Sequence, residues 1–267
     1  MKNDNLVVYL FTKYDDQKSL IDFANNYVEK SAGNSHKLLI CFKLIEEKKI
    51  LFLESLLPKI EYIKFIDPCE FNDFDFGSYK RIAKLYQNYN ILFLNSHSYP
   101  NTNLWLSKLL HHFKDKYIIA TSASYVSLYS SIKLKKFYKI FSYLIKRLSY
   151  KSKYYSYPNP HIRTTGFLIT GSDFYEFIKN KKISTKHDAW EIESGKKGLT
   201  NYFKKKNYNI LLINSDGICF NEKNWMYSET YNYLNQTKSI ISDKHSRKYY
   251  NLDSDQKQRY QFHTWGL

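Results

Sequence analysis

The first 120 residues alternate short apolar runs with segments of helical periodicity, and this alternation constrains the fold more than any other feature of the chain. The opening unit shows the pattern, because residues 6–11 form a run typical of a buried strand and residues 17–29 repeat apolar side chains at helical spacing. Further strands are expected at 37–42, 61–66, 91–94 and 117–120, and further helices at 50–57, 79–87 and 104–113. Such alternation predicts an α/β fold of three layers, with a mainly parallel central sheet covered by helices.

The second half of the chain is less regular. Strands are expected at 166–170 and 208–213, and helices at 172–179 and 194–206. From about residue 220 onward the chain is polar and aromatic, and we expect an irregular tail that folds over the site. Because no stretch rich in Pro, Gly or Ser separates the halves, residues 1–267 are expected to form a single domain.

The chain carries a formal charge of +16, from 41 basic and 25 acidic residues. This charge predicts attraction to polyanions, to phosphorylated substrates or to an anionic membrane surface, without choosing among them. The three cysteines, Cys41, Cys69 and Cys219, are far apart and lack metal-type spacing, which indicates reduced thiols in a cytoplasmic protein and no zinc site. No apolar segment is long enough to span a bilayer.

Residues 73–81 combine a glycine with a potential helix cap and two cations. Gly77 allows close backbone approach, and Ser78 is expected to cap a helix whose N-terminal N–H groups favour anions. Lys80 and Arg81 place positive charge in its first turn, which suits a diphosphate group.

The apolar run 91–94 then delivers Asn95 and Ser96 to the carboxyl end of a strand, where open α/β sheets bind ligands. Together with residues 73–81, this order of elements predicts a nucleotide-sugar pocket. Spacing alone fits an ordinary helix cap and buried strand equally well.

The segment 130–153 is strongly basic and contains no acidic residue. Its cations are Lys133, Lys135, Lys136, Lys139, Lys146, Arg147, Lys151 and Lys153. Apolar residues recur between them at helical spacing, which predicts a basic amphipathic helix. The helix could pack its apolar face on the core, lie on an anionic membrane with that face in the headgroup layer, or contact nucleic acid.

This succession of elements resembles the GT-A glycosyltransferase fold, and in particular bacterial polysaccharide-building enzymes of the rhamnan-synthesis type. The segment Phe74-Asp75-Phe76-Gly77-Ser78-Tyr79-Lys80-Arg81 is similar to a family segment that reads Y-D-F-G-S-Y/W-K. The strand end Phe93-Leu94-Asn95-Ser96-His97-Ser98 is similar to the strand end that follows it in the family. The resemblance implies a GT-A-like, Rossmann-like fold in one glycosyltransferase domain.

Many GT-A enzymes carry Asp-x-Asp at this strand end, where the carboxylates hold a divalent metal against the donor diphosphate. Here the positions read Asn95-Ser96-His97, which offer neutral oxygens and one imidazole. Either Mg²⁺ or Mn²⁺ is held by substitutes such as His97 and Asp75, or no metal is used and Lys80 and Arg81 neutralise the diphosphate. The second alternative is slightly favoured.

The segment 164–169 resembles the strand that floors a GT-A acceptor site, and Thr165 lies in it. His161 and Arg163 precede this strand, and they could bind an acceptor hydroxyl, a donor phosphate or each other. His161 is also a catalytic candidate, and His97 and Arg163 are expected to bind the acceptor. The plainer alternatives are that His161 satisfies a loop carbonyl and that Arg163 pairs with a structural carboxylate.

The segment 190–200 is similar to a family pattern in which a carboxylate opens a helix beneath the acceptor. Glu193 is therefore the first candidate for the general base, since such a group must come within hydrogen-bond reach of the attacking hydroxyl. Glu191 and Asp188 compete with it, and Trp190 is expected to contact the acceptor. Alternatively, Glu193 only caps the helix.

The resemblance implies transfer of a sugar from a UDP-, GDP- or dTDP-sugar to a hydroxyl of a cell-surface glycan or its lipid-linked precursor, with inversion if Glu193 is the base. Phe11, Thr12 and Tyr14 are expected to meet the base and ribose of the donor. His263 and Trp265 are expected to close over it as a lid.

Two other functions stay open from the sequence. A non-enzymatic nucleic-acid-binding protein would use the basic helix and the tyrosines, but the charge is not arranged as a continuous stripe, so no nucleic acid is expected as a partner. A degenerate GT-A protein would bind glycans without transfer. A transferase of this kind is expected in the cytoplasm, either free or in peripheral contact with the inner face of the membrane.

Overall fold

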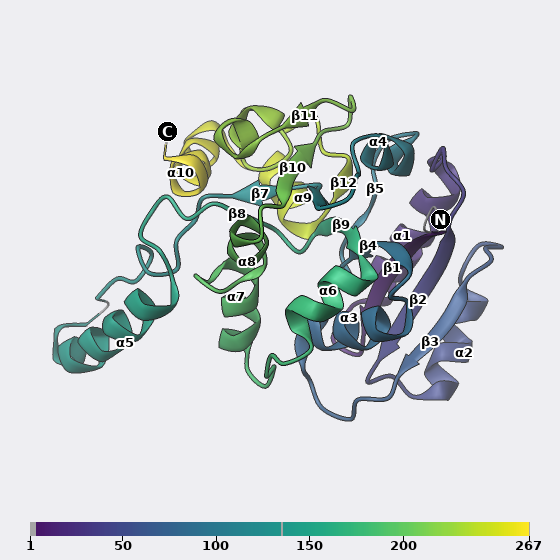
Figure 1. The fold of residues 1–267 in the computed structure, drawn as a ribbon, viewed down its shortest axis with the longest axis horizontal. Helices are drawn as coiled ribbons and strands as arrows, with labels where there is room; N and C mark the ends of the chain where they lie inside the picture. The colour runs from purple at the N-terminus through teal and green to yellow at the C-terminus, as the bar shows by residue number, and fades with distance from the viewer. Residues whose placement is uncertain (1–3, 135, 267) are drawn as a thin grey trace.

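The computed structural model describes residues 4–134 and 136–266, through which a single eight-stranded sheet runs with helices on both faces (Figure 1). The strands lie in the order β11 (Cys219–Phe220), β10 (Asn209–Ile213), β6 (Tyr117–Ala120), β9 (Gly166–Thr170), β4 (Tyr89–Leu94), β1 (Asp4–Thr12), β2 (Lys37–Lys43) and β3 (Ile63–Asp67). Strands β3, β2, β1 and β4 pair in parallel, as do β6 and β10. The predicted α/β fold with a mainly parallel sheet is confirmed.

Strand β9 runs antiparallel between β4 and β6, and the sequence pattern does not predict this. The chain leaves β6 at its carboxyl end, forms a long excursion over residues 121–165, and enters β9 at the same edge. Because the excursion never returns to the other edge, the strand must run in the opposite direction. Two segments of the excursion, β7 (Ala123–Ser124) and β8 (His161–Ile162), pair with each other.

Side chains of the central strands alternate between two apolar layers. In β1, Leu6, Val8 and Leu10 belong to one buried cluster, and Val7 and Tyr9 belong to the other. The first cluster receives α3 (Phe74–Leu85), α6 (Gly171–Ile178), α7 (Lys186–Ser194) and α8 (Leu199–Lys205). The second receives α1 (Gln17–Glu29), α2 (Glu47–Ser55) and α4 (Trp105–His111). This sorting is what makes the fold three-layered.

The helix bounds depart furthest from the sequence-based prediction at α3 and around Gly195. Helix α3 starts at Phe74, five residues before the expected 79, so Gly77 and Ser78 lie inside it. The expected helix 194–206 is shorter and forms α8, because the backbone is extended at Gly195 and Gly198; helix α7, which ends at Ser194, was not expected.

The expected irregular tail is more ordered than its composition indicates. It contains η2 (Glu222–Ser228), β12 (Ile241–Ser242), α9 (Lys244–Tyr250) and α10 (Ser254–Trp265). Strand β12 pairs with β5 (Tyr99–Pro100), so the tail folds back over the carboxyl edge of the sheet.

The basic segment forms η1 (Phe137–Lys139) and α5 (Ile140–Lys153), which project from the body at the left of Figure 1. Lys135 lies outside the described residues. Among the helices of the described ranges, none combines the length and apolar character that a bilayer crossing requires.

Candidate functional site

Two neighbouring parallel strands, β1 and β4, bring their following loops together at the carboxyl edge of the sheet. Asp15 links these loops. Its Oδ1 accepts a hydrogen bond from Ser96 Oγ at 2.8 Å and lies 3.4 Å from His97 Nε2, while its Oδ2 accepts from Thr12 Oγ1 at 2.7 Å. Asp15 is the residue that organises this edge, and the sequence analysis missed it.

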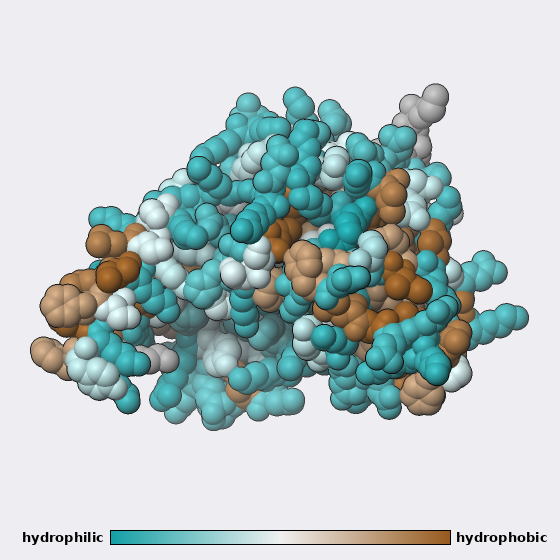
Figure 2. Space-filling model, turned by 90° about the horizontal axis from the view of Figure 1, so that it is seen from below, coloured by the Kyte–Doolittle hydropathy of each residue, from teal (hydrophilic) through white to brown (hydrophobic). Residues whose placement is uncertain are grey.

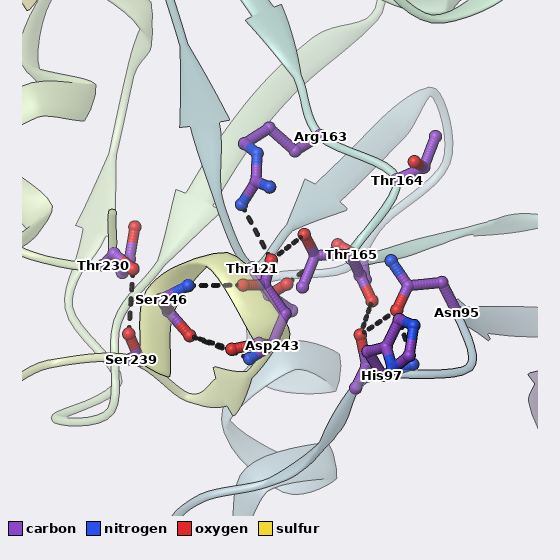
Figure 3. A network of polar contacts seen from close by, with 12 residues as sticks. Asn95, His97, Thr121, Arg163, Thr164, Thr165, Thr230, Ser239, Asp243 and Ser246 are labelled. Carbon is purple, nitrogen blue, oxygen red and sulfur yellow. Dashed lines mark hydrogen bonds and ion pairs between the residues drawn. The ribbon is translucent and has the colours of Figure 1, made fainter. Parts of the chain in front are cut away.

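The same edge carries the other residues expected there. Ser98 Oγ lies 2.7 Å from Asn95 Oδ1 and 2.8 Å from Thr165 O, within hydrogen-bond distance of both acceptors (Figure 3). Tyr14 is exposed, with Lys13 over its ring. Phe11 is different: its side chain is buried edge-on against Phe42, so it cannot contact a nucleoside and its assignment is corrected.

A cavity of about 160 Å³ opens between the first turn of α3 and helix α7. It is lined by Phe74, Asp75, Phe76, Thr164, Lys186, Ala189, Trp190 and Glu193. Ligand pockets usually measure about 300–1,000 Å³, so this cavity suits one part of a donor or acceptor, such as a sugar ring. A larger cavity of about 480 Å³ lies at the opposite, amino-terminal edge of the sheet, near Asn5 and Asp115.

Asp75 has an unfavourable environment. Burial, and then the negative charges of Asp15 and Glu193, raise the pKa of its carboxyl group to about 6. Within residues 4–134 and 136–266, no hydrogen bond or ion pair is formed with this carboxylate. Asp15, Asp75 and Glu193 are here called the acidic rim. Asp15 and Glu193 have hydrogen-bond donors of their own, whereas Asp75 has none in the described ranges and lies within the electrostatic reach of both, and such a perturbed carboxyl group is typical of a functional site.

Glu193 lies in the last turn of α7, and not at the start of a helix as predicted. It accepts hydrogen bonds from the backbone N–H of Thr164 at 3.1 Å and from Thr164 Oγ1 at 3.2 Å. A carboxylate at a helix C-terminus is opposed by the helix dipole, so the alternative that Glu193 serves as a helix cap is excluded.

The two competing carboxylates point elsewhere. Glu191 pairs with Lys153 at 2.7 Å and lines a separate cavity with Lys181 and Lys182. Asp188 closes the capping box of α7 with Thr185. Of the three candidates, Glu193 alone borders the cavity that contains Asp75 and Trp190.

His161 is buried beside Glu193. Its Nδ1 donates to the carbonyl of Asn159 at 2.8 Å, which leaves Nε2 as the basic nitrogen. Burial lowers the pKa of His161, and the charge of Glu193 opposes this effect. The imidazole therefore satisfies a loop carbonyl and also lies within the electrostatic reach of the candidate base.

The predicted phosphate-binding residues of α3 form a buried ionic cluster instead. The cluster consists of Lys43, Asp67, Asp73, Ser78 and Arg81. Arg81 donates to Asp73 at 2.6 Å and to Asp67 at 2.7 Å, and Lys43 pairs with Asp73. Ser78 Oγ donates to Asp67 at 2.5 Å, so it does not cap the helix.

Gly77 belongs to the same arrangement. A Cβ atom there would lie 1.9 Å from Asp73 Cγ, so the glycine leaves space for a carboxylate of the chain and not for a ligand. Lys80, on the helix surface, donates to the carbonyl of Lys181 at 3.4 Å. The assignment of Gly77, Ser78 and Arg81 to a diphosphate is therefore corrected.

Two residues expected to bind the acceptor hold the tail in place (Figure 3). Arg163 Nη1 and Thr165 Oγ1 donate to the same oxygen of Asp243, at 2.8 Å and 2.7 Å. Burial would raise the pKa of Asp243, but Arg163 and then the N–H of Ser246 hold it well below its usual value. Arg163 also lies 3.7 Å from the centre of the Tyr231 ring. The plainer interpretation of Arg163, a structural ion pair, is therefore correct. The assignment of Thr165 to the acceptor site is corrected as well, because its hydroxyl binds Asp243.

The predicted lid is also corrected. Trp265 is 5% exposed, packs against Tyr125, and donates its Nε1–H to Tyr231 O at 2.9 Å. His263 is exposed and lies 3.3 Å from Ser131 Oγ. A core tryptophan cannot open and close over a ligand without unfolding the layer that it completes.

No group of three or more His, Cys, Asp or Glu side chains in the described part of the chain could hold a metal ion by itself. Asp15 and His97 nevertheless provide two adjacent ligand atoms, 3.4 Å apart. Mg²⁺ is usually bound through one or two carboxylates together with substrate phosphates, so a complete cage of protein ligands is not required.

No known family profile matches the chain, and no curated protein sequence matches it. Solved structures similar to it include three glycosyltransferases. GlyE of Streptococcus pneumoniae TIGR4 gives a TM-score of 0.43 at 13% identity, over 97% of this chain and 60% of that one. Galactosyltransferase LgtC gives a TM-score of 0.43 at 11% identity, over 79% of this chain and 73% of that one. The bifunctional glycosyltransferase WbbM gives a TM-score of 0.39 at 13% identity, over 67% of this chain and 34% of that one. Because these TM-scores are below 0.5, the similarities carry no argument about the site, and its chemistry is argued from this chain's own residues.

Proposed function

We propose that this chain is a glycosyltransferase that moves a sugar from a nucleotide-diphosphate sugar to a hydroxyl of a glycan or its lipid-linked precursor, with inversion. The observation that supports this most is the placement of two carboxylates, Asp75 and Glu193, around a cavity bordered by Trp190. Aromatic faces stack on the C–H faces of sugars, and carboxylates accept hydrogen bonds from sugar hydroxyls. The cavity thus has carboxylate acceptors for sugar hydroxyls, and it is bordered by Trp190, whose ring stacks on His187 with Lys186 over it.

In the proposed reaction, Glu193 removes the proton from the acceptor hydroxyl as its oxygen attacks the anomeric carbon of the donor. The bond between that carbon and the diphosphate oxygen breaks, and the diphosphate leaves with the electron pair. The hydrogen bonds from Thr164 fix the Glu193 carboxylate, and His161 lies behind it. Inversion follows because the base and the leaving group lie on opposite sides of the carbon.

The donor diphosphate is proposed to lie at the edge formed by Asp15, Ser96 and His97, with Thr12 and Tyr14 toward the nucleoside. A diphosphate next to the acidic rim requires a counter-charge, and Arg81 is already paired within the ionic cluster. Either the cations Lys244 and Arg247, which lie within the electrostatic reach of His97, supply that charge, or Asp15 and His97 would hold Mg²⁺ or Mn²⁺, which would neutralise the leaving group.

Replacing Glu193 by Gln tests the role of the base. We expect kcat to fall by about 100- to 10,000-fold, as is typical for loss of a general base, because Gln cannot accept the proton. Donor binding, measured as a thermal shift across nucleotide sugars with and without Mn²⁺, should be nearly unchanged, since Glu193 is proposed to contact the acceptor hydroxyl.

The matched control is Glu191→Gln, which removes a carboxylate from the same helix but from a different cavity. Its turnover should stay within a few-fold of the parent. Equal turnover of Glu193→Gln and the parent would contradict the assignment of the base. A parent chain that binds sugars without any transfer would instead indicate a degenerate, glycan-binding protein.

A further inference from the structure

Helix α5 presents its apolar stripe to solvent. Phe141, Ile145 and Leu148 follow one another at helical spacing and are 78%, 69% and 68% exposed, and Phe137 of the preceding η1 is 83% exposed. Leu144 lies on the same face and is 47% exposed. A surface helix that packs its apolar face on the core would bury these side chains, so that interpretation of the basic segment is wrong.

The face of α5 turned toward the body is polar and aromatic. Tyr150 is buried there, and its hydroxyl lies 3.1 Å from His187 Nε2. A groove of about 420 Å³ runs between α5, residues 128–134 and helix α7, and it is bordered by Tyr143, Tyr150 and Trp190. Because these contacts hold α5 by its polar side, its orientation follows from the fold.

Cations surround the stripe without any carboxylate nearby in the sequence. No acidic residue occurs between Asp115 and Asp173, a span that includes all of α5. Lys136, Arg147 and Lys151 are exposed beside the stripe. Figure 2 shows the outcome: brown side chains gather at the end of the molecule that α5 forms, with teal ones beside them.

We propose that this face of α5 docks onto an anionic phospholipid bilayer. An amphipathic helix of this kind lies in the interface, with its apolar side chains among the acyl chains and its cations at the headgroups. A second copy of α5 would bring two basic surfaces together, which charge repulsion opposes. Nucleic acid would pair with the cations but would leave Ile145 and Leu148 in water.

Docking through α5 would place the candidate site at the membrane. Trp190 borders both the α5 groove and the cavity that contains Asp75 and Glu193. If the proposed function is correct, the acceptor is a lipid-borne saccharide that reaches Glu193 along this groove. Membrane docking itself does not depend on that function.

The test is sedimentation of the full chain with vesicles of phosphatidylcholine alone or with phosphatidylglycerol added in a one-to-two ratio. We expect binding only to the anionic vesicles and weaker binding at high salt. Phe141→Ser with Ile145→Ser should reduce binding by about tenfold or more, because two apolar side chains no longer enter the bilayer. Lys136→Gln with Lys151→Gln should also reduce it, through the charge.

Two matched controls come from α2, where Leu51 and Phe52 are 57% and 55% exposed and Lys48 and Lys49 are exposed as well. Leu51→Ser with Phe52→Ser, and Lys48→Gln with Lys49→Gln, should bind vesicles as the parent does. All variants should keep the parent's melting temperature, since the altered side chains are in solvent.

Equal binding of the parent to neutral and anionic vesicles, or no loss in the α5 variants, would overturn the proposal. So would a stable dimer that the Phe141 and Ile145 changes dissociate, or salt-sensitive DNA binding that the serine variants leave intact. Vesicle binding without any sugar transfer would retain the membrane surface and reject the proposed function separately.

Discussion

Asp73 and Asp75 are two residues apart at the start of α3, and the fold surrounds them with opposite charges. Asp73 belongs to the ionic cluster, where burial alone would raise its pKa but hydrogen bonds from Arg81 and Lys43 hold the pKa below its usual value. Asp75 belongs to the acidic rim, where burial and two carboxylates raise its pKa to about 6. The comparison shows that an aspartate paired with cations stabilises the fold, whereas an aspartate without such a partner is available for chemistry.

The largest change in stability is expected when Asp73, the aspartate that is paired with cations, is replaced. Asp73→Ala should lower the free energy of unfolding by about 3–5 kcal/mol, because Lys43 is then left as a buried charge without its carboxylate. Chemical denaturation measures this change. Glu70→Ala, at a nearby exposed carboxylate, is the control and should stay within about 0.5 kcal/mol of the parent. A similarly small change for Asp73→Ala would show that the cluster is not structural.

A smaller change in stability, of opposite sign, is expected when Asp75, the aspartate without a partner, is replaced. Asp75→Asn should raise the free energy of unfolding at pH 7 by about 1–2 kcal/mol, because ionising this carboxyl costs more in the folded chain than in the unfolded one. The folded pKa of about 6 lies above the ordinary 3.8, so the parent loses stability as pH rises through that window. The advantage of the variant should therefore vanish as pH falls to the lower end of the window.

Denaturation at a series of pH values checks this prediction, with exposed Asp115→Asn as the control. Destabilisation by Asp75→Asn at pH 7 would mean that the carboxylate is satisfied in the folded chain, and the contrast with Asp73 would fail. We also expect Asp75→Asn to impair transfer, so that a gain in stability accompanies a loss of activity.

The smallest effect is expected at Lys80, a cation of α3 that does not join the ionic cluster. Its ammonium group donates to the carbonyl of Lys181, and burial and then the charge of Arg81 lower its pKa. Lys80→Ala should change nucleotide affinity, measured by calorimetry, by less than about twofold, since such surface substitutions are usually within about 0.5 kcal/mol. A tenfold loss of nucleotide affinity would instead show that Lys80 binds the donor phosphates.

The layered fold could be predicted because buried strands and amphipathic helices have different periods, and β1 and α1 show both clearly. The direction of β9 could not be predicted, since it depends on where the excursion 121–165 runs. Periodicity located the apolar stripe of α5 but contained no information about which side would meet the body.

The candidate site was predictable only in part. Glu193 and Trp190 were named from a resemblance, and the structure places them in one cavity with Asp75. Arg81 was misassigned because its partners, Asp67 and Asp73, become neighbours only through tertiary packing. Asp15 was missed because a carboxylate in a loop has no periodic pattern, and its contacts with Ser96 and His97 cross more than eighty residues.

The tail described above affects the order in which the molecule can be completed during synthesis. Asp243 holds Arg163 and Thr165, and Trp265 fills the apolar layer beneath the excursion. Until Asp243 has left the ribosome, the segment that carries Thr164 lacks this anchor, so the hydrogen bond from Thr164 that fixes Glu193 is expected to form only after Asp243 has been made.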